Sequence, residues 1–228
     1  MRTGGRHVTE PGEGLTPVAQ DYLKVIWSAG EWSEAPVTTT LLARRLGVGV
    51  STVSETVRRL TDQGLVEHEP YGAVALTRVG RESAVAMVRR HRLIETFLVR
   101  QLGYSWDEVH DEAEVLEHAV SSLMVERMDV ALGRPDRDPH GDPIPSADGE
   151  VRVPAARRLG EVAPGRWRVA RISDEDPSLL RSFAALGLGL DVAVQVGART
   201  ASAVGVEVGG QRLELDERSC NAVWLVAE

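Results

Sequence analysis

The spacing of apolar residues predicts three helices in the first part of the chain. Apolar side chains recur every three to four positions from Thr16 onward, which places them on one face of a helix. A second helix is expected over residues 38–46, followed by Gly47, and a third from Ser51 to Gly64. Two helices joined by a short turn that contains glycine have the spacing of a helix-turn-helix.

The pattern then alternates between apolar and polar residues before it returns to a helical period. Two short strands, residues 65–69 and 73–77, flank a Tyr-Gly turn and predict a β-hairpin. A hairpin directly after a helix-turn-helix is typical of a winged helix. Longer helical segments are expected over residues 77–102 and 106–132.

A cluster of proline, glycine and aspartate between residues 133 and 145 predicts a linker, and short alternating runs follow it. Five short strands in this last part of the chain predict a small β-barrel. The expected fold class is therefore mainly α with a small β domain. The expected strands are 167–172, 191–196, 204–208, 211–215 and 222–226.

The 228 residues carry a formal net charge of −8, which argues against nucleic acid as a partner, but the acidity is local. Residues 91–150 contain fourteen acidic and five basic side chains, whereas residues 38–90 contain eight arginines and five carboxylates. The chain has no long apolar run and no secretory signal, and its one cysteine, Cys220, cannot form an intramolecular disulfide. A cytoplasmic protein that does not span a membrane is expected.

The basic module is a candidate for DNA binding. In a helix-turn-helix the second helix enters the major groove, where hydroxyl and arginine side chains can contact phosphates or bases. Glu55 could only accept from a cytosine amino group. The alternative is that these residues cap helices and form a solvated face, and winged helices also serve as protein–protein modules. The expected DNA contacts are Arg44, Ser51, Thr52, Ser54, Glu55, Arg58 and Arg59.

The acidic segment VHDEAEVLEH, residues 109–118, predicts a metal site. On a helix, its two histidines and two of its glutamates share one face, where a cation would offset their repulsion. His91 and Glu95 form a similar pair on the preceding helix, and Asp21 lies beside an apolar stripe where a carboxylate needs a partner. The alternative is an acidic, solvated face with incidental histidines. The residues on the shared face are His110, Glu114, Glu117 and His118.

Motifs of enzyme active sites are absent from the sequence. It has no HExxH motif, nucleophile elbow, phosphate-binding loop or dinucleotide-binding glycine motif, and Cys220 has no neighbouring histidine. We therefore expect neither an enzyme nor a small organic substrate.

Six segments, in order and correctly spaced, resemble the diphtheria toxin repressor family of metal-dependent transcriptional repressors. The resemblance implies a homodimer that binds a palindromic operator in double-stranded DNA when loaded with metal, and that controls metal-uptake genes. The matching segments are AQDYLKVIW, LGVGVSTVSETVRRLTDQGLV, LTRVGRESA, RHRLIETFL, VHDEAEVLEH and DPHGDPIP.

The resemblance also implies three domains after an N-terminal extension, residues 1–14, for which disorder is expected. A winged helix-turn-helix DNA-binding domain is expected over residues 15–85. A helical metal-binding and dimerisation domain with its linker follows over residues 86–150. An SH3-like domain of the FeoA type is expected over residues 151–228.

The family's metal sites, carried over residue by residue, fall largely on side chains that the residue pattern singles out. In some members one further ligand comes from the SH3-like domain, for which Asp176, with Glu175 beside it, is the candidate. The resemblance places the primary site on Asp21, Glu114, Glu117 and His118, and the ancillary site on His91, Glu95, His110 and Asp176.

The ligand types favour manganese. The family's iron-responsive branch has methionine and cysteine where this chain has Asp21 and Glu114, and the manganese-responsive branch has these carboxylates. Carboxylates suit Mn(II), although Fe(II), Co(II), Zn(II) or Cd(II) could substitute. Lys24 stands where some two-domain manganese regulators have the glutamate of a dinuclear cluster, so the ancillary site is expected to hold the second ion. The alternatives are an iron(II)-dependent regulator of the same family and a metal-buffering protein that does not bind DNA.

Overall fold

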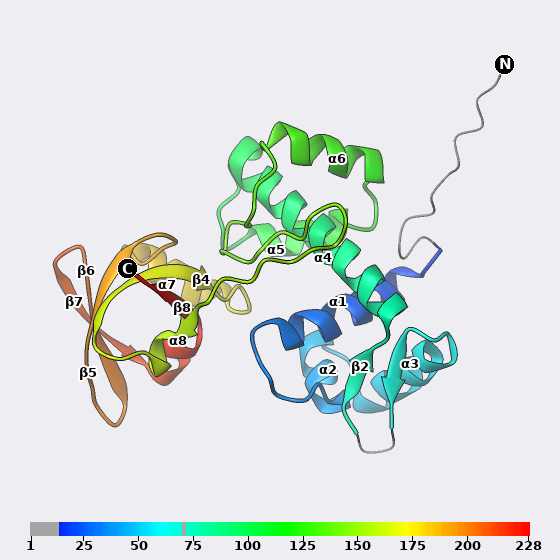
Figure 1. The fold of residues 1–228 in the computed structure, drawn as a ribbon, viewed down its shortest axis with the longest axis horizontal. Helices are drawn as coiled ribbons and strands as arrows, with labels where there is room; N and C mark the ends of the chain where they lie inside the picture. The colour runs from blue at the N-terminus through cyan, green and yellow to red at the C-terminus, as the bar shows by residue number, and fades with distance from the viewer. Residues whose placement is uncertain (1–13, 70–71) are drawn as a thin grey trace. The chain divides into compact units, whose positions relative to one another are not determined.

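The computed structural model describes residues 14–69 and 72–228, so the N-terminal extension, apart from its last residue, lies outside the described residues. The chain divides into two compact units, Met1–Arg90 with Pro145–Glu150 and His91–Ile144 with Val151–Glu228 (Figure 1). The domain boundaries expected from the sequence stay a prediction. No helix among the described residues is long and apolar enough to cross a membrane.

The first unit contains the predicted helix-turn-helix. The hydroxyl oxygens of Thr16 and Thr38 cap the first two helices by accepting from the backbone N–H groups of Ala19 and Leu41. Gly47 ends the second helix in the left-handed conformation, with a φ of 66°. The three helices are α1 (Pro17–Glu31), α2 (Thr39–Leu46) and α3 (Val50–Asp62).

Helix α3 begins before the expected Ser51 cap. Gly49 stands at the N-cap position and no side chain caps the helix, so the prediction of a Ser51 cap is wrong. Because Val50 is already helical, Ser51 lies inside the first turn with an exposed side chain. One face of α3 is buried and the opposite face is polar, as the apolar period predicts. The buried residues of α3 are Val53, Thr56, Val57 and Leu60.

The wing is an antiparallel hairpin directly after α3. Val66 lies opposite Leu76, and the expected turn residue Tyr71 lies outside the described residues. The Thr77 hydroxyl donates to the Gly64 carbonyl at 2.8 Å and so connects the base of the wing to the end of α3. The two strands are β1 (Val66–His68) and β2 (Val74–Leu76).

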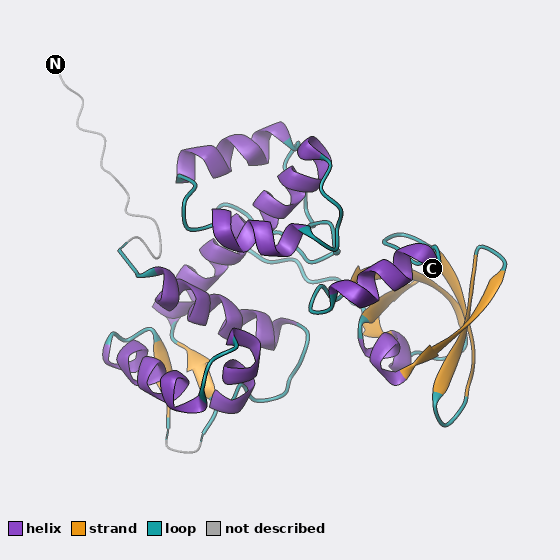
Figure 2. Ribbon diagram, turned by 180° about the vertical axis from the view of Figure 1, so that it is seen from behind, coloured by secondary structure: helices purple, strands orange, loops and turns teal. Residues whose placement is uncertain are grey.

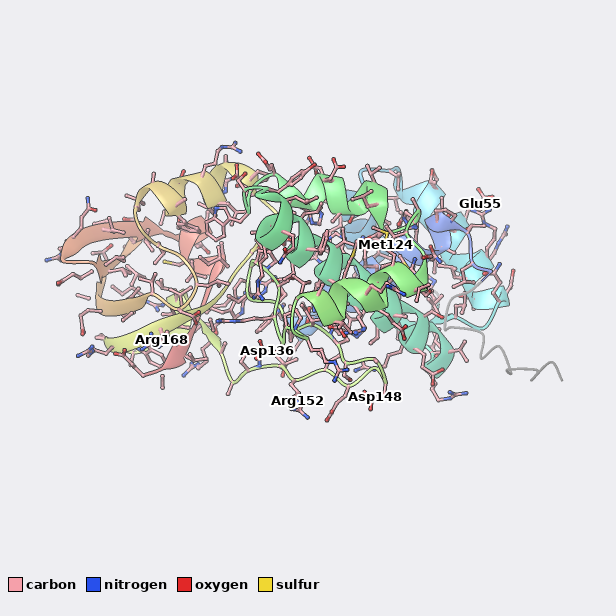
Figure 3. The ribbon with its side chains drawn as sticks, turned by 90° about the horizontal axis from the view of Figure 1, so that it is seen from above. Glu55, Met124, Asp136, Asp148, Arg152 and Arg168 are labelled. Carbon is pink, nitrogen blue, oxygen red and sulfur yellow. The ribbon has the colours of Figure 1, made fainter. Side chains whose placement is uncertain are left out.

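Three helices follow the wing where the sequence predicts two. Helix α4 crosses the division between the units at His91 and continues as a π-helical turn. The segment over residues 106–132 breaks after Leu116, because Ser121 caps a new helix by accepting from the backbone N–H of Met124, a residue labelled in Figure 3. The elements are α4 (Arg78–Phe97), the π-helical turn Leu98–Leu102, α5 (Val109–Leu116) and α6 (Ser122–Ala131).

The rest of the second unit is a small antiparallel β domain, which confirms the predicted fold class. Its strands, in the order β3-β8-β4-β5-β6-β7, curve around a buried apolar interior that includes Phe183 and Leu225 (Figure 2). All five predicted strands are present, whereas β3, two short α-helices and a 3₁₀-helical turn at Leu159–Glu161 are additional to the prediction. The elements are β3 (Arg157–Arg158), β4 (Gly165–Ile172), α7 (Pro177–Ala185), β5 (Ala193–Arg199), β6 (Ala203–Val208), β7 (Gln211–Asp216), α8 (Glu217–Asn221) and β8 (Val223–Ala227).

The linker expected at residues 133–145 is an ordered loop that contacts both parts of the second unit. The Arg92 guanidinium of α4 donates to the Pro143 carbonyl at 2.6 Å. The backbone N–H of Ile172 in β4 donates to the His140 carbonyl at 2.9 Å. These bonds hold the loop between α4 and β4, where the side chains of Asp138, His140 and Asp142 are buried.

Candidate metal centre

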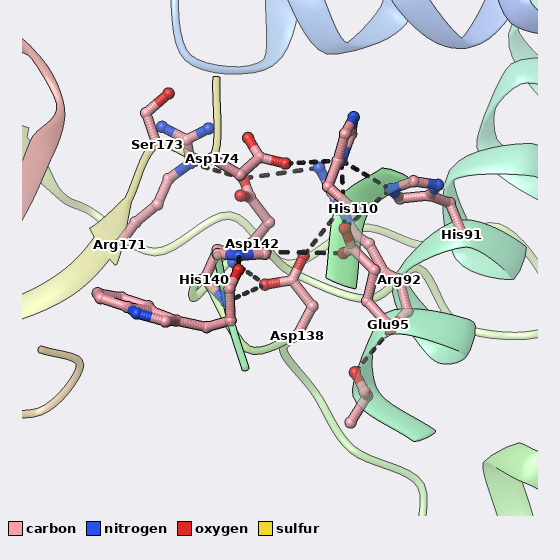
Figure 4. A network of polar contacts seen from close by, with 12 residues as sticks. His91, Arg92, Glu95, His110, Asp138, His140, Asp142, Arg171, Ser173 and Asp174 are labelled. Carbon is pink, nitrogen blue, oxygen red and sulfur yellow. Dashed lines mark hydrogen bonds and ion pairs between the residues drawn. The ribbon is translucent and has the colours of Figure 1, made fainter. Parts of the chain in front are cut away.

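Two helices of the second unit bring three predicted ancillary ligands together (Figure 4). On α4, the His91 Nε2 lies 3.0 Å from the Glu95 Oε1. On α5, the His110 Nδ1 lies 3.3 Å from both of these atoms. Ligand atoms on a divalent ion with bonds of about 2.1 Å are about 3.0–3.4 Å apart, so these three atoms fit one ion.

The small β domain places a fourth ligand atom here, but from Asp174 rather than from the expected Asp176. The Asp174 Oδ2 lies 3.2 Å from the His110 Nδ1. Asp176 instead caps α7 by accepting from the Leu179 N–H, and it pairs with Arg218. An aspartate directly before the proline of a helix start has the signature of an N-cap, a sequence signal that assigns Asp176 to the helix.

The close contacts set the charges of these ligands. Burial would lower the pKa of His110, but hydrogen bonds with Asp174 and Glu95 outweigh it and raise that pKa to about 11. Burial would raise the pKa values of Asp174 and Glu95, yet the neighbouring histidines hold both well below the usual carboxylate range. The metal-free site therefore keeps a proton on His110, and a metal ion must displace it.

Three predicted primary ligands lie at the end of α5. The helix ends at Leu116, so Glu117 is its C-cap and His118 follows in a turn, instead of both continuing the helical face of Glu114. The side chain of Glu117 is fully buried, and its Oε2 lies 2.6 Å from the His91 Nδ1. This contact keeps a proton on Nδ1 and directs the lone pair of the His91 Nε2 at the ancillary ligands.

The remaining primary candidates are placed less closely. The His118 Nε2 lies 3.5 Å from the Glu117 Oε1, and the Glu114 Oε1 lies 3.6 Å from the His110 Nε2. Asp21 is half-buried on α1, in the first unit, and its part in the primary site stays a prediction.

The helix-turn-helix presents an exposed polar face. All residues of α3 that are predicted to contact DNA are exposed, among them Glu55, which Figure 3 labels, and Arg44 on α2 is exposed too. The Arg59 guanidinium donates to the Thr56 hydroxyl at 3.2 Å, which orients it along the helix. Which of these side chains contact DNA stays a prediction. The exposed α3 residues that are predicted to contact DNA are Ser51, Thr52, Ser54, Glu55, Arg58 and Arg59.

The tip of the linker loop adds buried polar residues that the sequence analysis did not single out. The Asp138 Oδ1 accepts from the backbone N–H groups of His140 and Asp142 at 2.8 and 2.9 Å. Burial, with the negative charges of Asp142 and Glu95, raises the pKa of Asp138 to about 7. The Arg171 guanidinium donates to Asp142 at 2.6 Å. The only sequence signal is a histidine between two aspartates in the segment DPHGD, because a loop has no period to reveal its buried face.

Profiles of three domain families match successive parts of the chain. The N-terminal DNA binding domain of iron dependent repressors matches residues 14–74. The metal binding and dimerisation domain of iron dependent repressors matches residues 77–146. The FeoA domain matches residues 157–227.

Two curated repressors are similar over part of their length. The iron-dependent repressor IdeR of Mycobacterium tuberculosis is 37% identical over 131 residues, which cover 58% of this chain and 56% of that protein. The diphtheria toxin repressor of Corynebacterium diphtheriae is 32% identical over 168 residues, which cover 70% of this chain and 74% of that protein. The chain thus spans little more than half the length of the iron-dependent repressors that it matches.

Solved structures of metal-bound regulators cover more of the chain. A manganese-dependent transcriptional repressor in complex with manganese is 55% identical, with a TM-score of 0.89, and the match covers 92% of this chain and 100% of that one. ScaR with bound Cd²⁺ is 31% identical, with a TM-score of 0.81, and the match covers 92% of this chain and 99% of that one.

Proposed function

Because the chain belongs to the diphtheria toxin repressor family of metal-dependent transcriptional repressors, we propose that it is loaded with Mn(II) and then binds a palindromic operator as a homodimer. The family consists of DNA-binding regulators, so the chain is a regulator and not an enzyme. Metal-uptake genes are the proposed targets, because a repressor that needs a metal shuts off its import when the metal is abundant.

The chemical types of the ancillary ligand atoms support the choice of manganese. The four ancillary ligand atoms of His91, Glu95 and His110 with Asp174 are nitrogen and oxygen, and each lies 3.0–3.3 Å from a neighbour in the set. Such donors suit Mn(II), whereas sulfur ligands select softer ions. The one cysteine, Cys220, is buried in α8 of the β domain. The 55% identity to a manganese-dependent repressor supports the same choice.

The primary ion would connect the DNA-binding unit to the metal-binding helices. The ion would be bound by Asp21 on α1 and by three residues of the second unit, Glu114, Glu117 and His118. Its positive charge would offset the repulsion among the carboxylates. This connection restricts the spacing of the two recognition helices in a dimer and favours the arrangement that fits both half-sites. A metal at a hundredfold its Kd can bias this equilibrium by about 2.7 kcal/mol per site.

Two surfaces support the proposed partners. The exposed hydroxyl and arginine side chains of α3 suit phosphates and base edges. Helix α6 exposes apolar side chains, since Leu123, Met124 and Val130 are between 46% and 65% exposed. Apolar side chains gathered on one helix are typical of a surface that a second protein copy covers.

A mobility-shift assay on the DNA upstream of the chain's own gene, with and without Mn²⁺, tests the proposal. A shift that requires Mn²⁺, disappears in Asp21→Ala and persists in Asp111→Ala is expected, because Asp111 is an exposed carboxylate of α5 outside the ligand set. A shift that a chelator does not change would contradict the metal requirement. Mn²⁺ binding without any shift would favour the metal-buffering alternative.

An iron(II)-dependent regulator is the second candidate, favoured by the 37% identity to an iron-dependent repressor. Operator binding titrated with Fe²⁺ under anaerobic conditions and with Mn²⁺ separates the two. Half-maximal binding at a lower concentration of free Fe²⁺ than of free Mn²⁺ would favour the iron regulator.

A further inference from the structure

Arg171 is a buried cation on the face of β4 that points away from the apolar interior of the β domain. Val169 and Ile172 both lie in that interior, although they are three positions apart on the strand. The pairing of β4 with β8 shifts between Val169 and Arg171, and a β-bulge of this kind redirects the side chains that follow it. Arg171 therefore faces outward, and yet it is only 8% exposed.

The guanidinium of Arg171 contacts an aromatic ring and a carboxylate. Its central carbon lies 4.1 Å from the ring centroid of Trp224, the cross-strand neighbour of Arg171 on β8. Its Nε donates to the Asp142 Oδ1 of the linker loop at 2.6 Å. Stacking on tryptophan and pairing with a carboxylate are both stronger where water is excluded. Together the two contacts hold the guanidinium in one orientation.

Asp142 continues the connection to helix α4 (Figure 4). The Oδ1 that accepts from Arg171 also lies 3.6 Å from the guanidinium of Arg92. On α4, Arg92 directly follows His91 and precedes Glu95, which supply two of the ancillary ligand atoms. Two ion pairs through one carboxylate thus connect the end of β4 to the helix that carries these ligands.

The end of β4 also leads to Asp174, the ligand that the β domain supplies. Asp174 follows Arg171 by three positions, and the backbone N–H of Ser173 between them donates to the Ala222 carbonyl at 2.8 Å. This connection is short and anchored, so a shift of Arg171 relative to α4 would move Asp174 as well. The Asp174 Oδ2 lies 3.2 Å from the His110 Nδ1, as two ligands of one ion require.

We propose that Arg171 is a positioning residue of the ancillary metal site. Through Asp142 it holds the end of β4 against α4, so that Asp174 lies at ligand distance before a metal ion binds. The inference rests on the proposed function for the existence of the ancillary site and adds how the β domain is aligned with it. The other three ligands, on α4 and α5, do not depend on Arg171.

Electrostatics alone predicts the opposite effect of Arg171 on metal binding. A positive charge close to a metal site repels the ion, so loss of this charge would strengthen Mn²⁺ binding. Loss of a residue that positions a ligand weakens metal binding instead, by about 10–100-fold for partners just outside the ligand shell. The sign of the change therefore distinguishes positioning from a simple charge effect.

Equilibrium dialysis of the full chain over a range of Mn²⁺ concentrations tests the proposal. Arg171→Gln is expected to weaken the ancillary site about tenfold and to leave the primary site unchanged. Asp21→Ala, which removes a proposed primary ligand, identifies the binding phase of the ancillary site. Equal or tighter ancillary binding by Arg171→Gln overturns the proposal.

The same strand offers a matched control in Arg168, which Figure 3 labels. Arg168 is partly exposed and pairs with Glu228, away from the linker loop. Arg168→Gln makes the same substitution on β4 and is expected to bind Mn²⁺ as the wild type does. An equal loss of ancillary affinity in Arg168→Gln and Arg171→Gln would overturn a specific role for Arg171.

A double-variant cycle separates positioning from a general loss of structure. In Asp174→Ala the ligand that Arg171 positions is absent, so adding Arg171→Gln should not weaken the ancillary site further. An equal loss in the presence and absence of the Asp174 carboxylate would indicate a general effect and overturn the proposal.

A second variant keeps the test decisive if Arg171→Gln does not fold. Arg171→Lys retains the charge that offsets Asp142 but lacks the flat guanidinium that stacks on Trp224. Weaker ancillary binding in this variant supports the proposal, and binding equal to that of the wild type overturns it. A wild-type chain that does not bind Mn²⁺ at the ancillary ligands would instead overturn the ancillary site of the proposed function, and this inference with it.

Discussion

The two nitrogens of His91 face different carboxylates. The Nδ1 lies 2.6 Å from Glu117, a proposed primary ligand, and the Nε2 lies 3.0 Å from Glu95, an ancillary ligand. A histidine held in this way has a fixed ring orientation and tautomer, so its ligand atom is positioned before a metal arrives. Preorganisation at this centre thus depends on individual side-chain contacts between α4 and α5.

The proton on His110 predicts a pH-dependent metal affinity. Its pKa of about 11 lies above the value of an unfolded histidine, so protonated His110 stabilises the metal-free chain below about pH 6.5, and this contribution is lost as the pH rises toward 11. A metal ion must displace this proton, so affinity at the ancillary site is expected to rise about tenfold per pH unit around neutrality. Calorimetric titration with Mn²⁺ in buffers of different ionisation enthalpy should show about one proton released. Binding without proton release at pH 7 would refute this charge state.

Asp174 and Asp176 are expected to respond differently to the same substitution. Asp174→Ala removes an ancillary ligand and should weaken Mn²⁺ binding there about tenfold or more. Asp176→Ala removes the cap of α7 and should lower the free energy of unfolding by about 1 kcal/mol without changing Mn²⁺ affinity. Denaturant titration and Mn²⁺ dialysis of both variants provide the comparison. If Asp176→Ala weakened Mn²⁺ binding and Asp174→Ala did not, Asp176 would be the ligand.

At the scale of elements, local signals account for the helix ends that the sequence predicts. Thr16, Thr38 and Gly47 act through hydrogen bonds or backbone conformation within a few residues, so their sequence context is sufficient. The break between α5 and α6 is hidden because Glu117 and His118 continue the helical spacing of the ligands before them. The helical face predicted for the primary ligands is therefore correct only as far as the end of α5.

The parts of the metal centre that escape prediction depend on contacts between distant segments. His140 is defined by the Trp106 carbonyl, thirty-four positions earlier, and by Glu95 on another element. Asp174 becomes a ligand candidate only because β4 ends beside His110. Periodicity identifies faces of helices and strands, but it carries no information about which loop folds over which face.

The exposed arginines of helix α3 lead to a prediction for DNA binding. Arg58→Ala removes an exposed cation from the expected groove-facing surface and should weaken operator binding and reduce the slope of log affinity against log salt by about one. Arg78→Ala is the matched control, because Arg78 is exposed but belongs to α4 and pairs with Glu82. Fluorescence anisotropy of a labelled operator across salt concentrations gives both slopes. An equal effect of the two variants would exclude a specific role for Arg58.

At the scale of the whole molecule, the contact between His91 and Glu117 predicts that the two proposed metal sites are coupled. His91→Ala removes an ancillary ligand and also the hydrogen-bond partner of Glu117, so primary-site affinity for Mn²⁺ should fall about tenfold. Asp174→Ala weakens the ancillary site without removing a contact of Glu117, and it should leave the primary-site affinity closer to that of the wild type. Equilibrium dialysis at low Mn²⁺ compares the primary-site affinities of the two variants. Equal primary affinities in both variants would rule out this coupling.

The central claim is that a donor set of oxygen and nitrogen makes operator binding respond to manganese. The most direct test is the ratio of free Fe²⁺ to free Mn²⁺ at half-maximal operator binding, measured anaerobically for the wild type, Glu114→Cys and the control Asp111→Cys. Since a thiolate favours softer ions than a carboxylate does, Glu114→Cys is expected to shift the ratio toward Fe²⁺ while Asp111→Cys leaves it unchanged. An unchanged ratio in Glu114→Cys would contradict the claim.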